Sequence, residues 1–63
     1  MGYKRFSNEE EVEEMLRRAE DRDYSNKSDM YNILVQIKSE WRGKYYSERA
    51  KYLIDTEFAE FNP

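Results

Sequence analysis

Apolar residues recur at intervals of three and four along most of this 63-residue chain, and this spacing is interrupted in two places. It is typical of amphipathic helices, whose apolar side chains form one stripe that faces a core. The uninterrupted apolar runs are at most three residues long, whereas a membrane-spanning helix needs about 20. The pattern therefore predicts three helices, near residues 8–23, 29–42 and 46–61, and no membrane-spanning segment.

The first helix is expected to begin at Ser7 or Asn8. Either residue can cap it, because Glu10 and Glu11 stand three residues later and can complete a capping box. Almost every other position of this helix is charged. Its apolar stripe consists of Val12, Met15, Leu16 and Ala19.

The second helix is expected to be capped by Ser28 or Asp29. Gly43 follows it and is a suitable residue to end it. If the helix instead continued through Gly43, the resulting long helix could not close its own core and would have to dimerise. The apolar face of the second helix holds Met30, Ile33, Leu34, Ile37 and Trp41.

The third helix carries a charged residue, Glu57, in the middle of its apolar face. An unpaired buried carboxylate is expensive, so we expect Glu57 to pair with a lysine or arginine of another helix or to lie outside the core. The alternative is a polar residue in an interface. The apolar face itself consists of Tyr46, Ala50, Leu53, Ile54, Phe58 and Phe61.

Three antiparallel helices joined by short loops predict an all-α fold, a small three-helix bundle that forms a single domain over residues 1–63. The chain has no cysteine and no histidine. It therefore cannot form a disulfide, a thiolate nucleophile or a Ser-His-Asp triad. We predict no catalytic residue, no metal site and no cofactor, so the chain is not expected to be an enzyme. The N-terminal residues lack the apolar stretch of a signal peptide, which favours a cytoplasmic location.

Aromatic residues make up 16% of the chain, more than three short helices need for their main apolar stripes. Helices 2 and 3 each carry a second stripe that mixes tyrosines with arginines or lysines. Tyrosine, tryptophan and arginine are enriched where proteins bind one another. We therefore expect a small regulator, adaptor or inhibitor of a larger protein, such as a virus-encoded inhibitor. Its partner-binding surface is predicted to consist of Trp41, Arg42, Tyr45, Tyr46, Arg49 and Tyr52, with the arginines pairing with acids of the partner.

Charge patterning leaves other partners open. Residues 9–23 contain eight acids and three bases, so the first helix could imitate a nucleic acid and block a protein that binds one. Residues 36–52 contain five bases and two acids among aromatic residues, which is a pattern for weak binding of single-stranded nucleic acid. The net charge of −3 and the pI of 4.9 argue against that second alternative. A homodimer could use the same aromatic stripe, and no membrane partner is expected.

Overall fold

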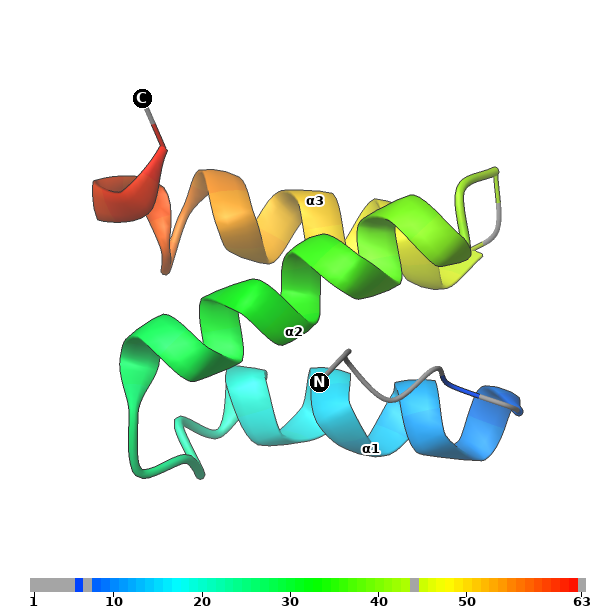
Figure 1. The fold of residues 1–63 in the computed structure, drawn as a ribbon, viewed down its shortest axis with the longest axis horizontal. Helices are drawn as coiled ribbons and strands as arrows, with labels where there is room; N and C mark the ends of the chain where they lie inside the picture. The colour runs from blue at the N-terminus through cyan, green and yellow to red at the C-terminus, as the bar shows by residue number, and fades with distance from the viewer. Residues whose placement is uncertain (1–5, 7, 44, 63) are drawn as a thin grey trace, which may run out of the picture.

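Three α-helices and one short 3₁₀ helix make up most of the chain that the structure describes. The computed structural model describes residues 6, 8–43 and 45–62. The elements are α1 (Glu9–Glu20), α2 (Lys27–Glu40), α3 (Tyr45–Asp55) and the 3₁₀ helix η1 (Ala59–Phe61). Successive helices run antiparallel to one another (Figure 1). The predicted all-α three-helix bundle is confirmed.

Asparagine side chains cap the first two helices. The side chain of Asn8 accepts a hydrogen bond from the Glu11 N–H at 3.0 Å, as the sequence predicts. The side chain of Asn26 does the same for the Asp29 N–H, also at 3.0 Å. The prediction that Ser28 or Asp29 caps α2 is therefore wrong. Asn26 satisfies a free N–H of the first turn and leaves the carboxylate of Asp29 at the positive end of the helix dipole.

The two turns between the helices each contain a residue with positive φ. Gly43, with φ of 82°, separates α2 from α3 as predicted, because glycine adopts this conformation without steric cost. Arg22, with φ of 57°, follows α1. Around it the Arg22 N–H donates to the Ala19 carbonyl at 3.2 Å and the Asp23 N–H to the Arg18 carbonyl at 2.7 Å. This pair of bonds is the Schellman motif, and it ends α1 at Glu20 rather than at residue 23.

The third helix is shorter than the predicted 46–61. It ends at Asp55, where the Thr56 hydroxyl donates to the Tyr52 carbonyl at 2.8 Å, and a turn leads into η1. An α-helix that continued would carry Glu57 into the apolar face. The turn instead brings Glu57 to Arg22, whose Nε and Nη2 donate to its two oxygens at 3.2 and 2.8 Å. The expected ion pair of Glu57 is thus present, with an arginine just beyond the end of α1.

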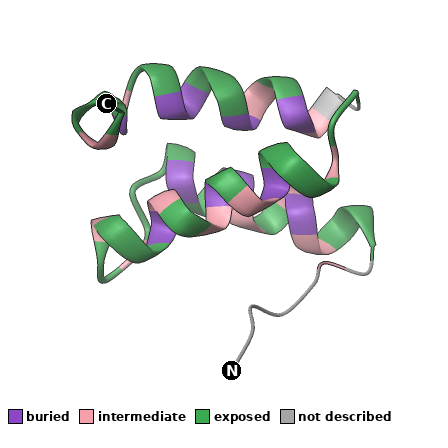
Figure 2. Ribbon diagram, turned by 45° about the horizontal axis from the view of Figure 1, so that its top comes forward, coloured by how far each residue is buried: buried purple, intermediate pink, exposed green. Residues whose placement is uncertain are grey.

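The core lies between the three helices, whose buried faces turn toward one another (Figure 2). Aromatic rings extend it to the C-terminal segment. The ring of Phe58 is fully buried and lies 5.8 Å from that of Tyr24, and the ring of Phe61 stacks on Tyr31 at 5.1 Å. The buried core consists of Val12, Leu16, Ala19, Met30, Leu34, Ile37, Ala50, Leu53, Ile54 and Phe58.

Candidate functional site

Trp41 and Tyr46 lie where α2 and α3 join, and they contact each other. Their ring centroids are 5.9 Å apart in an edge-to-face arrangement. Both side chains are half-buried and pack against the core. These two members of the predicted partner-binding surface therefore already have packing partners within the chain, and each offers only part of its ring to another molecule.

Arg49 points toward α1 and is held there by two carboxylates. Its Nη1 donates to Glu13 and its Nη2 to Glu20, both at 2.8 Å, and 23% of its side chain is exposed. Partial burial lowers the pKa of Arg49, but the hydrogen bonds that it donates to Glu20 and Glu13 outweigh this effect and raise the pKa above its ordinary value. The Arg49 guanidinium is thus engaged with acids of its own chain.

Arg42 and Tyr52 are the exposed members of the predicted surface. Arg42 lies in the turn after α2, and Tyr52 stands in the middle of α3 with 67% of its surface exposed. Tyr45 begins α3, and its side chain lies outside the described residues. The five predicted residues whose side chains are described are therefore divided between the α2–α3 junction, the side of α3 that faces α1, and the exposed face of α3.

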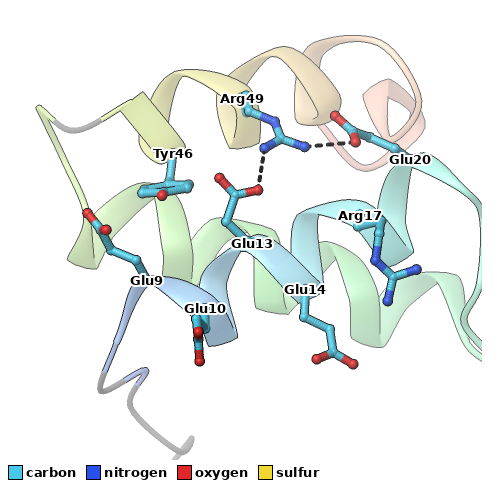
Figure 3. A pocket seen from close by; sticks show the side chains of 8 residues that line it. All are labelled: Glu9, Glu10, Glu13, Glu14, Arg17, Glu20, Tyr46 and Arg49. Atoms are coloured by element: carbon cyan, nitrogen blue, oxygen red, sulfur yellow. Dashed lines mark hydrogen bonds and ion pairs between the residues drawn. The ribbon is translucent and has the colours of Figure 1, made fainter.

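An open groove of about 540 Å³ runs between α1 and α3, and the sequence analysis does not predict it. Figure 3 shows Arg49 reaching across this groove from α3 to Glu13 and Glu20 on α1. Burial raises the pKa of Tyr46 in the groove, and the negative charges of Glu9 and Glu13 raise it further. The groove is lined by Glu9, Glu10, Glu13, Glu14, Arg17, Glu20, Tyr46 and Arg49.

The groove is acidic, because five glutamates and two arginines line it, which gives a net charge of −3. One arginine is Arg49, which is engaged by Glu13 and Glu20. Within the described part of the chain, the carboxylates of Glu9 and Glu10 have no ion-pair partner.

A sequence signal for the groove does exist. Glu9, Glu13 and Glu20 are four and seven residues apart, so helical spacing of about 100° per residue places them on one face of α1. That spacing shows an acidic stripe beside the apolar one. It does not show which helix packs next to the stripe, and this packing is what makes a groove.

A smaller hollow of about 180 Å³ lies where α1 and α2 are joined. Its apolar walls come from Met15, Met30 and Ile33, with Tyr24 beside them. Two aspartates and an arginine surround this apolar patch. The hollow is too small for a drug-sized ligand, whose pockets measure about 300–1,000 Å³.

Comparison with known protein families, with curated proteins and with solved structures gives no match for this chain. In the part of the chain that the structure describes, no group of three or more acidic side chains is placed to hold a metal ion. None of the helices described is both long and apolar enough to cross a membrane. The candidate functional sites are therefore features of the surface of the bundle itself.

Proposed function

We propose that this chain is a non-enzymatic protein-binding module whose contact surface is centred on Tyr52, on the exposed face of α3. One observation carries the proposal. Of the eight aromatic side chains that the structure describes, Tyr52 is the exposed one, and the other seven are buried or half-buried. A tyrosine that a fold leaves in water can bury a large apolar area on a partner at low entropic cost.

The neighbours of Tyr52 on α3 support a protein partner. Glu48 and Asp55, one turn before and one turn after it, are exposed and acidic. A nucleic acid at this face would bring its phosphates close to both carboxylates, which opposes binding. The arginine on the neighbouring side, Arg49, is engaged by Glu13 and Glu20. We therefore do not propose that the Tyr52 face binds single-stranded nucleic acid.

This function requires no reacting group. The chain contains neither cysteine nor histidine, and the groove between α1 and α3 is open and lined mainly by glutamates. We propose that a chain of this kind acts by covering or bridging surfaces of a larger protein. Its cytoplasmic location stays a prediction from the sequence.

The proposal is tested by affinity capture from the native source with three forms of the chain. We expect wild-type protein and Val35→Ala to retain the partner and Tyr52→Ala to lose it, by about 1–3 kcal/mol of binding free energy. Val35 is the matched control because, among the described residues, it is the other exposed large apolar side chain, at 40% exposure on α2. All three unfolding temperatures should agree.

Two results contradict the proposal. Retention of the partner by Tyr52→Ala would remove Tyr52 from the contact surface. Concentration-dependent dimerisation of the wild-type chain that Tyr52→Ala abolishes would assign the surface to a second copy instead, and analytical ultracentrifugation measures this directly.

A further inference from the structure

We infer that the partner bound at Tyr52 presents a basic segment whose arginine side chains enter the groove between α1 and α3. This inference rests on the proposed function, because it names the chemistry of the same partner. It follows from the position of the groove beside Tyr52, from the charge of both surfaces and from the way in which the groove holds an arginine of its own chain.

The groove and the exposed tyrosine form adjacent surfaces. Tyr52 lies three residues after Arg49 on α3, so the two side chains are neighbours on the helix surface. Arg49 forms the α3 wall of the groove (Figure 3). A segment that covers Tyr52 and extends toward α1 therefore passes over the groove.

Both surfaces are acidic. The groove lining carries five glutamates against two arginines, and Glu48 and Asp55 flank Tyr52 on its other side. An exposed aromatic ring with carboxylates on both sides complements an apolar segment that carries positive charges. An acidic partner would meet like charges on each side of the tyrosine.

Arginine fits this groove better than lysine does. The Arg49 guanidinium shows how the groove engages such a group, with two nitrogens donating to carboxylates two helical turns apart, each at 2.8 Å. A guanidinium presents several donors in one plane, whereas an ammonium is a single point charge. Glu10 and Glu14 lie further along the acidic side. Glu14 pairs with Arg18 at 3.5 Å, and Glu10 has no ion-pair partner among the described residues.

A small molecule is a poorer occupant. Pockets for small ligands are concave and mostly apolar, with a few polar groups. This groove is open along its length, and seven of its eight lining residues are charged. Its carboxylates suit cationic side chains, but the groove cannot remove an apolar ligand from water.

The test uses a fluorescently labelled nona-arginine peptide as the probe and a nona-glutamate peptide as its control, with anisotropy measured at about 150 mM salt. We expect the wild-type chain to bind the arginine peptide and not the glutamate peptide. Glu10→Lys with Glu14→Lys should weaken binding about tenfold or more, because like charges then face each other. Asp23→Lys with Asp29→Lys is the matched control.

The control pair changes the net charge by the same amount, since each pair reverses two acids. It also reverses one acid in a first helical turn, Asp29 in α2, as Glu10 is in α1. Asp23 and Asp29 are exposed and lie beside the smaller hollow instead of the groove. The control should weaken binding less than about threefold, because exposed charges are largely screened beyond a Debye length.

Circular dichroism shows whether each variant is folded. If a lysine variant is not, Glu10→Gln with Glu14→Gln is compared with Asp23→Asn and Asp29→Asn. Equal losses in the groove variant and its control would mean that net charge alone attracts the peptide and would overturn the inference. Failure of the wild-type chain to bind nona-arginine would overturn it as well.

The captured partner separates this inference from the proposed function. If Tyr52→Ala loses the partner while the variant at Glu10 and Glu14 keeps it, the module is retained and the basic segment is rejected. If both variants lose it, both conclusions are supported. If Tyr52→Ala keeps the partner, the proposed function fails, whatever the peptide shows.

Discussion

Arg49 joins two helices through a single guanidinium group. Its two bonds, to Glu13 and Glu20, are charge-assisted and link α3 to positions two turns apart on α1. Such bonds are stronger than neutral ones, although the exposure of both glutamates, at 43% and 42%, weakens them. Arg49 therefore belongs to the framework of the bundle, and Tyr52 beside it is the exposed residue that we propose as the partner contact.

Replacing Arg49 tests this role. We expect Arg49→Met to lower the free energy of unfolding in urea by about 1–2 kcal/mol, because Glu13 and Glu20 lose their partner. The free energy of unfolding of Arg49→Lys should fall between those of the wild type and Arg49→Met, since one ammonium cannot donate to both carboxylates in the same geometry. Arg42→Met is the control. Arg42 is exposed, so its replacement should change the free energy by less than about 0.5 kcal/mol. Equal effects at both positions would show that the bridge contributes nothing.

Around Arg49 the sequence predicts which side chains are buried in the core. It does not predict which partners the surface side chains contact. Ala50 and Leu53, one and four residues after Arg49 in the chain, belong to the predicted apolar face and are buried. Arg49 lies at the edge of that face, where helical spacing allows either solvent or a neighbouring helix. The Arg49 side chain turns toward α1 because the acidic stripe of α1 lies there. The packing of α1 against α3 follows from the apolar faces of all three helices together.

Capping residues and ion pairs set the ends of the helices in this bundle, and the spacing of apolar residues does not predict them. Phe58 and Phe61 are three residues apart, which suits an α-helix and a 3₁₀ helix equally well. The informative residue is Glu57, because a continuing helix would carry its charge into the apolar face. The position of Glu57 in the sequence reveals this conflict, yet the turn after Asp55 could not be predicted without knowing that Arg22 lies within reach.

The turn after α1 predicts an unusual order of stability. Arg22 has a φ of 57° and pairs with Glu57 while 68% of its side chain is exposed. Both Arg22→Gly and Arg22→Ala remove the ion pair, which contributes about 0–1 kcal/mol at such exposure. Only glycine adopts the left-handed conformation freely, so we expect Arg22→Gly to be more stable than Arg22→Ala by about 1 kcal/mol.

The comparison has an internal control on the same helix. In the interior of α1, at exposed Arg17, the order should reverse, with Arg17→Ala more stable than Arg17→Gly by about 1 kcal/mol. Thermal unfolding followed by circular dichroism measures all four variants. The same order at both positions would mean that α1 does not end in a Schellman motif.

At the scale of the whole molecule, stability depends on few side chains. Among the residues that the structure describes, ten form the buried core of this 63-residue chain. Domains are stable by about 0.05–0.15 kcal/mol per residue, which for this length is about 3–9 kcal/mol. The ion pairs between segments are partly exposed and add modestly to this total. Burial of a few large side chains must therefore supply most of the free energy of folding.

Replacing Phe58 tests whether a few buried side chains supply most of the free energy of folding. The ring of Phe58 is fully buried, packs against those of Tyr24 and Phe61, and lies 5.7 Å from the Lys27 ammonium. Removing a buried phenylalanine ring costs about 3–5 kcal/mol, which is comparable to the whole stability of a chain this small. We expect Phe58→Ala to be largely unfolded at 25 °C by circular dichroism and urea titration.

Tyr52→Ala deletes an aromatic side chain from the same molecule and should unfold like the wild type, because Tyr52 is exposed. If both variants unfolded alike, Tyr52 would be part of the folding core, and the surface assigned to a partner would be needed by the chain itself.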